Sequence, residues 1–87
     1  MNYTILYRPG VEREMSKLPW PLLKRVDMAI IGLANNPRPH GSKKLGGHGN
    51  LYRIRVGDWR IVYEVSDLRH EVEIQIVANR KDVYRGL

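Results

Sequence analysis

Cysteine is absent from this 87-residue sequence, so disulfide bonds and thiolate metal sites cannot stabilise it. The sequence also lacks a run of about 18 apolar residues, the length that a membrane-spanning helix needs. Its N-terminus does not show the charged and then apolar pattern of a secretory leader. Neither an internal repeat nor a linker is apparent, which favours one small domain. These absences predict a soluble cytoplasmic protein.

Acidic residues are scarce relative to basic ones. Fifteen lysines and arginines stand against nine aspartates and glutamates, which gives a formal net charge of +6. A basic balance of this size suits nucleic acid, an acidic protein partner or an anionic membrane surface. The sequence has no basic amphipathic helix with large exposed apolar residues, so the membrane is the weakest of the three and is not expected as a partner.

The most regular segment is Leu51–Val65, which alternates apolar and charged residues on both sides of Gly57-Asp58. This pattern predicts a β-hairpin closed by a two-residue type II′ turn, in which Gly57 takes the required positive φ. The predicted register places six apolar or aromatic side chains on one face, as the pairs Val56–Trp59, Ile54–Ile61 and Tyr52–Tyr63. These side chains, the aromatic ones included, are expected to belong to the core.

The opposite face of the hairpin is mainly charged and carries Arg53, Arg55, Arg60, Val62 and Glu64. Arg55 would lie directly opposite Arg60, and like charges that face each other across a ladder are destabilising. Surface charges usually form only a solvated face, here balanced by nearby glutamates. Arginine within the strands nevertheless favours phosphate binding, because its planar guanidinium makes bidentate contacts and stacks on bases. With Lys43 and Lys44 in the preceding loop, these arginines predict an open, phosphate-binding sheet face.

The remaining segments predict a helical hairpin packed on this sheet. Alternation predicts strands over Asn2–Tyr7 and over Glu71–Ala78. Apolar residues at helical spacing predict helices over Val11–Leu18 and Leu22–Asn35. In the last strand the residues expected to face inward are Val72, Ile74 and Ile76. The expected fold class is therefore α+β, with an N-terminal strand and an αα-hairpin packed on a mainly antiparallel sheet.

The polar, glycine-rich segment Arg38–Asn50 is expected to be a loop that leads into the hairpin. Its glycines superficially suggest a phosphate-cradling loop, but the segment lacks a Gly-Lys-Ser/Thr ending and does not open a helix, so no nucleotide site is predicted. The histidines His40, His48 and His70 have no metal-ligand spacing. No metal ion and no cofactor are expected.

Two motifs carry a family resemblance: the run from Arg53 to Tyr63 (Arg-Ile-Arg-Val-Gly-Asp-Trp-Arg-Ile-Val-Tyr), and the terminal Arg-x-x-x-Tyr of Arg80 and Tyr84. Together with the order of the segments, they resemble the RelE family of toxin–antitoxin ribonucleases over nearly the whole chain. The resemblance implies a single toxin domain over residues 1–87, built as a small antiparallel sheet flanked by helices. It also implies a ribosome-dependent endoribonuclease that cuts mRNA in the decoding site and is held inactive by an antitoxin.

Carried over by position, the resemblance implies that Arg60 and Arg80 stabilise the reacting phosphate and that Arg53 and Arg55 hold the RNA backbone. Tyr84 matches the C-terminal tyrosine of the family and would be either a base or an orienting group. The sequence departs from the family in two ways. Some members have lysines at the positions of Arg53 and Arg55, and many have Gly-His-Arg where this chain has Ala78-Asn79-Arg80. Both departures bear on proton transfer, because arginine essentially cannot release a proton.

Two alternatives belong to other functional classes. A ParE-like toxin on the same scaffold would inhibit DNA gyrase by binding, and a non-enzymatic RNA-binding module would need only the basic charge. For a toxin, the expected antitoxin is an acidic, largely extended segment that folds as it binds. Apolar anchors near Trp20 would carry most of its affinity.

Overall fold

The computed structural model describes residues 2–47, 49–83 and 85. Its elements in chain order are β1 (Thr4–Tyr7), α1 (Val11–Met15), α2 (Trp20–Asn35), β2 (Lys43–Lys44), β3 (Leu51–Val56), β4 (Trp59–Ser66) and β5 (Glu71–Asn79). The strands form one five-stranded sheet in the order β1-β5-β4-β3-β2. β1 pairs with β5 in parallel, and the other neighbours pair antiparallel. The predicted α+β fold with a mainly antiparallel sheet is confirmed.

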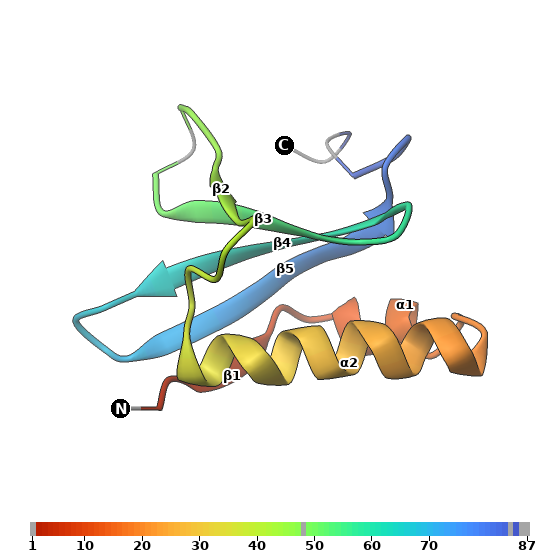
Figure 1. The fold of residues 1–87 in the computed structure, drawn as a ribbon, viewed down its shortest axis with the longest axis horizontal. Helices are drawn as coiled ribbons and strands as arrows, with labels where there is room; N and C mark the ends of the chain where they lie inside the picture. The colour runs from red at the N-terminus through yellow and green to blue at the C-terminus, as the bar shows by residue number, and fades with distance from the viewer. Residues whose placement is uncertain (1, 48, 84, 86–87) are drawn as a thin grey trace.

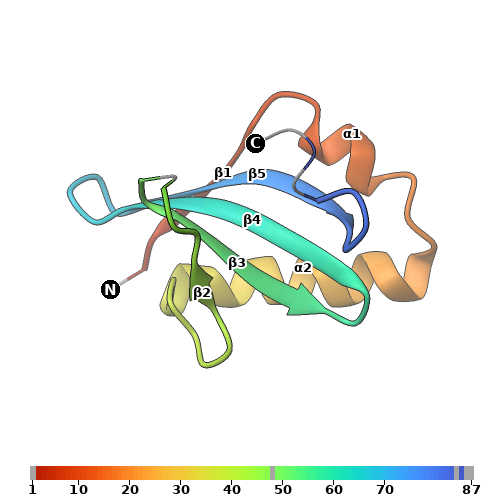
Figure 2. The same ribbon diagram turned by 90° about the horizontal axis from the view of Figure 1, so that it is seen from above.

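Both helices lie on one side of the sheet, whereas β2 and the turns after β5 lie toward the other side (Figure 1). Seen from above, α2 runs beneath the sheet (Figure 2). The apolar stripe of α2 is fully buried and comprises Val26, Ile30 and Leu33. These side chains pack with the inward-facing residues of the strands in one core cluster. We call this covered side of the sheet the inner face and the opposite side the outer face.

The central hairpin has the predicted register. Val56 pairs with Trp59, Ile54 with Ile61 and Tyr52 with Tyr63. Gly57 has a φ of +58°, which a side-chain-bearing residue rarely adopts and which the first position of a type II′ turn requires. The aromatic residues of the hairpin belong to the core, as predicted: Tyr63 is fully buried, and Tyr52 and Trp59 pack against the cluster.

The prediction for Ile76 is wrong, because β5 contains an irregularity that the alternation does not reveal. Tyr63 pairs with Ile74 but its neighbour Val62 pairs with Ile76, so Gln75 is an extra residue in β5. A bulge of this kind shifts the side-chain alternation by one position. Val77 therefore enters the inner core in place of Ile76, which pairs with Val62 on the outer face.

Smaller differences concern the boundaries. The expected loop 38–50 contains the short strand β2, which pairs with Arg53 and Tyr52 of β3. α1 ends at Met15, earlier than the helical spacing to Leu18 predicts, and α2 begins two residues earlier, at Trp20, with Pro21 in its first turn. Proline is accepted there because the first turn of a helix leaves its N–H groups unpaired. No helix among the described residues is long and apolar enough to cross a bilayer.

A basic outer face around the hairpin turn

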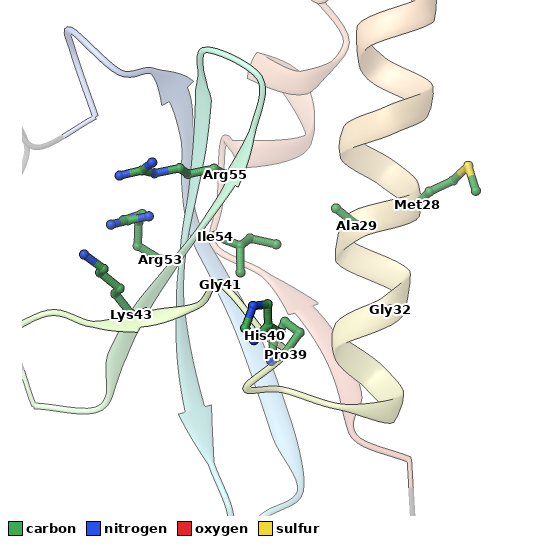
Figure 3. A pocket seen from close by; sticks show the side chains of 10 residues that line it. All are labelled: Met28, Ala29, Gly32, Pro39, His40, Gly41, Lys43, Arg53, Ile54 and Arg55. Carbon is green, nitrogen blue, oxygen red and sulfur yellow. The ribbon is translucent and has the colours of Figure 1, made fainter.

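The predicted basic residues gather at one end of the outer face. Lys43 pairs with Arg53, and Arg55 pairs with Arg60 across β3 and β4. Side chains of paired residues share a face of the sheet. Figure 3 shows the side chains of Lys43, Arg53 and Arg55 pointing away from α2, whereas Ile54 between the two arginines points toward Ala29 of the helix. Four predicted site residues thus share one surface.

Lys44 is not part of this surface. It pairs with Tyr52, whose side chain belongs to the inner face. Because neighbouring residues of a strand point to opposite faces, Lys43 and Lys44 diverge. Lys44 is exposed, so it remains available at the sheet edge, but it lies apart from the arginines.

Arg53 is buried, and this corrects the expectation of an open arginine face. The residue is only 7% exposed, and its buried Nε has no hydrogen-bond partner among the described residues. Val62, the cross-strand neighbour of Arg53, is 0% exposed, and Val83 after β5 is 1% exposed. The turns after β5 thus cover part of the outer face (Figure 1). A buried guanidinium nitrogen without an acceptor is costly, and an anion bound at this point would supply the missing acceptor.

The hairpin turn holds two further arginines. Nη1 of Arg60 donates hydrogen bonds to the backbone oxygens of Gly57 and Trp59, at 2.9 and 3.0 Å. The backbone N–H of Arg80 donates to the oxygen of Asp58 at 2.8 Å, and its Nε lies 4.0 Å from the Asp58 carboxylate. The turn therefore fixes the backbone of Arg80 and the guanidinium of Arg60 at the same end of the sheet as Arg55.

The segment after β5 begins as a hydrogen-bonded turn. Asn79 accepts bonds from the N–H groups of Asp82 and Val83 on its backbone oxygen, and from the N–H of Lys81 on its side chain. This turn leads to the buried Val83. Two residues considered from the sequence, Tyr84 and His48, lie outside the described residues.

Sequence reasoning missed a polar cluster around Arg38, which anchors the segment between α2 and β2. The guanidinium of Arg38 contacts both carboxylate oxygens of Asp67 at 3.2 and 2.9 Å, and its Nε donates to the hydroxyl of Tyr52 at 3.0 Å. The hydroxyl of Tyr3 donates to the same carboxylate at 2.6 Å. Arg38 first, and then Tyr3, hold the pKa of Asp67 below its usual value. The four residues are far apart in the sequence, so no local pattern indicates their contact.

The opposite end of the outer face is acidic. Glu64 of β4 pairs with Glu73 of β5, and Glu71 is two residues before Glu73. These glutamates line a hollow of about 350 Å³ together with Arg69 and Leu6. The outer face is therefore divided, with positive charge near the β3–β4 turn and negative charge near the β4–β5 turn.

A hollow of about 550 Å³ lies beside the basic face. It is bordered by Ala29 and Gly32 of α2, by Pro39 and His40 of the following loop, and by β3 (Figure 3). The long basic side chains point out of it, toward the outer face. The described residues contain no group of three or more histidine, aspartate or glutamate side chains that could hold a metal ion. The chemistry that the basic face supports is therefore stabilisation of negative charge by arginine.

Comparison with known proteins identifies the family. Residues 5–84 match the family described as the ParE toxin of the type II toxin–antitoxin system parDE. The chain is 31% identical to Toxin RelE of Mycobacterium tuberculosis over 84 residues, which cover 95% of this chain and 87% of that protein. This chain belongs to the RelE/ParE family of type II toxins. It is thus a RelE-type toxin of a toxin–antitoxin system, and the recognised resemblance is confirmed.

Solved structures of the family have the same fold. The archaeal RelE–RelB complex from Pyrococcus horikoshii OT3 contains a chain with a TM-score of 0.82 and 28% identity, matched over 92% of this chain and 97% of that one. The toxin–antitoxin complex RelBE2 from Mycobacterium tuberculosis gives a TM-score of 0.80 and 27% identity, over 94% and 95% of the two chains. This RelE-type toxin therefore aligns with its relatives over nearly its whole length.

Proposed function

We propose that this toxin is a ribosome-dependent endoribonuclease that cuts mRNA. The observation that carries the proposal is Arg53, a buried arginine whose Nε finds no partner within the part of the chain that the structure describes. It shares one face of the sheet with Arg55 and Lys43. A folded protein rarely leaves a buried donor without an acceptor, and a bound ligand can supply one. The phosphates of RNA are suitable counter-charges, because guanidinium groups bind them in bidentate geometry.

The proposed reaction uses a nucleophile from the substrate. The 2′-hydroxyl attacks the adjacent phosphorus, the bond from phosphorus to the 5′-oxygen breaks, and a cyclic phosphate forms. One proton leaves the 2′-hydroxyl and one reaches the departing 5′-oxygen. This chemistry needs no metal-activated water, but the extra negative charge on the phosphorane must be stabilised.

The proposed roles of the residues are those that the family resemblance implies. Arg60 and Arg80 stabilise the phosphorane, and Arg53 and Arg55 hold the neighbouring backbone, together with Lys43. Lys44, on the other side of the sheet edge, contacts RNA outside the reacting nucleotides. Tyr84 is the proposed group for proton transfer or substrate orientation. Arginine is a poor proton donor, so the arginines do not form an acid–base pair by themselves. We therefore expect cleavage to depend on the decoding site of the ribosome, which would also orient the substrate.

The test is cleavage of one message in two settings. Purified toxin is mixed with naked mRNA or with the same mRNA on ribosomes that have an empty decoding site, and the cuts are mapped by primer extension. The proposal predicts cleavage on the ribosome and little or none of naked RNA. Equal rates in both settings would contradict ribosome dependence, and no cleavage in either would contradict the nuclease assignment.

Inhibition of DNA gyrase is the second candidate function, favoured by the family match to ParE toxins. A gyrase inhibitor has no need for an arginine set centred on the buried Arg53. A supercoiling assay with purified gyrase separates the candidates: our proposal predicts unchanged supercoiling at toxin concentrations that stop translation.

An antitoxin is the proposed protein partner, since the similar chains from Pyrococcus horikoshii and Mycobacterium tuberculosis are in complexes of toxin and antitoxin. The net charge of +6 favours an acidic, extended segment. The exposed apolar residues of α2, Trp20, Met28 and Ile31, are the proposed anchors. Because opposite charges accelerate encounter, added salt should lower the association rate far more than it raises the dissociation rate. Stopped-flow binding at two ionic strengths tests this.

A further inference from the structure

The charge of the outer face changes along the strands and not across them. The strand pairing aligns outer-face residues in rows that run perpendicular to the strands. The row nearest the hairpin turn contains Arg55 and Arg60, and the next contains Lys43, Arg53 and Val62. The third row contains Glu64 and Glu73 and no basic residue. A polyanion that crosses the strands stays on basic rows, whereas one that follows a strand must enter the acidic row.

The acidic row is close enough to act on a phosphate bound at Arg53. Successive rows are two residues apart, which is about 7 Å along a strand. This spacing is within the Debye length of about 8 Å at physiological salt, so screening leaves much of the repulsion. The row is also held in place, because Nε2 of Gln75 donates to the Glu73 carboxylate at 2.5 Å. The nearby Arg69 brings one positive charge to a hollow that contains three glutamates.

We infer that single-stranded RNA crosses β3 and β4 at the hairpin end, and that Glu64 and Glu73 form the border of its path. This inference rests on the proposed function and adds the direction and the limit of the RNA track. The first and the third row each contain two like charges opposite each other: Arg55 faces Arg60 in the first, and Glu64 faces Glu73 in the third. Each such pair destabilises the sheet, and a path bounded by repulsion gives both pairs a role. The border also explains why long free RNA would bind weakly, since its flanking phosphates would have to approach the glutamates.

The test compares two double variants that change the net charge equally. Glu64→Gln with Glu73→Gln removes the border, and Glu12→Gln with Glu14→Gln removes two exposed charges from α1, on the helix side of the sheet. Binding is measured by fluorescence anisotropy at low salt with 2′-O-methyl RNA, which cannot undergo attack by its 2′ oxygen. One oligonucleotide has about 4 nucleotides and the other about 16, the range of single-strand site sizes.

The border variant should bind the long oligonucleotide on the order of fivefold more tightly than the wild type does. Its affinity for the short oligonucleotide should be nearly unchanged. The slope of log affinity against log salt should also steepen for the long oligonucleotide only, by about 0.7 for each additional phosphate contact. In the α1 variant, any change in affinity or in the salt slope should be the same for the short and the long oligonucleotide.

Two results would overturn the inference, and they differ in what else they contradict. The border variant could gain equal affinity for the short and the long oligonucleotide, or both double variants could gain equal affinity for the long one. Either result would mean that the glutamates act only through net charge. The phosphate-binding face would survive this result. Failure of every protein to bind either oligonucleotide would instead contradict the phosphate-binding face and the proposed function with it.

Discussion

The two faces of the sheet bury their residues in different ways. On the inner face, apolar side chains from both helices and four of the strands form one cluster, and the buried hydroxyl of Tyr63 donates to the backbone oxygen of Pro37 at 2.7 Å. On the outer face, Val62 and Val83 are also buried, but Arg53, which pairs with Val62, has an Nε without a partner among the described residues. The inner face satisfies its polar groups and supplies stability. The outer face retains a buried donor nitrogen without an acceptor among the described residues, which indicates a binding surface.

The inner face should give the largest effect on stability. Ile61→Ala removes a fully buried side chain from the core, so the free energy of unfolding should fall by about 2–5 kcal/mol. Leu68→Ala is the matched control, because Leu68 is 96% exposed in the β4–β5 turn and should change stability little. Urea unfolding measures both. A loss below about 1 kcal/mol for Ile61→Ala would mean that the inner core repacks easily.

The outer face should give a large effect on activity with little effect on stability. Arg60→Ala should lower ribosome-bound cleavage by about 10²–10³-fold, as expected when a donor to the transition state is removed. Unfolding should change little, because the loss of two hydrogen bonds in the turn is offset by relief of the repulsion from Arg55. Arg13→Ala on α1 is the control. Full activity of a folded Arg60→Ala protein would remove Arg60 from the site.

A smaller effect concerns the pH dependence of the inner face. Burial raises the pKa of Tyr63 to about 12, from an ordinary value of 10.0. The folded state therefore favours the neutral phenol, and this contribution is complete below pH 10 and is lost as the pH rises from 10 to 12. It amounts to at most about 3 kcal/mol. The pKa of Tyr7 is also raised, and Tyr7 therefore makes stability fall with pH in the same direction. The measurement is for this reason the difference in the free energy of unfolding between the wild type and Tyr63→Phe. Parallel stability curves above pH 10 would contradict the assignment.

The hairpin was predictable from the sequence because its signals are local. Alternation over Leu51–Val65 and the glycine at position 57 specify both the pairing and the faces, and the structure has that register. The outer position of Arg53 and Arg55 follows from the same alternation. The extra residue in β5 is different, because Val72, Ile74 and Ile76 alternate without a break in the sequence. The bulge is visible only when the pairing with β4 is known.

The environment of the site residues was less predictable than their positions. Arg53 is buried although its strand position is on the outer face, and Val83, 30 positions further along the chain, is buried as well, with the turns after β5 on that side of the sheet. The cluster of Arg38, Asp67, Tyr3 and Tyr52 likewise joins four distant segments. Such contacts arise from tertiary packing, and local patterns in the sequence do not predict them. The divergence of Lys43 and Lys44 required the pairing of β2, a strand of two residues.

The most direct test of the difference between the two faces is Arg53→Met, measured for unfolding and for RNA binding on the same preparation. Methionine keeps much of the volume but removes the buried charge, so the free energy of unfolding should be unchanged or higher. Affinity for the short 2′-O-methyl oligonucleotide should fall by about tenfold or more, the loss expected for a hydrogen bond to a charged group. Arg53→Lys keeps the charge but lacks the planar guanidinium, so its affinity for this oligonucleotide should lie between those of the wild type and Arg53→Met. An Arg53→Met protein that unfolds more easily and binds RNA as the wild type does would contradict the account.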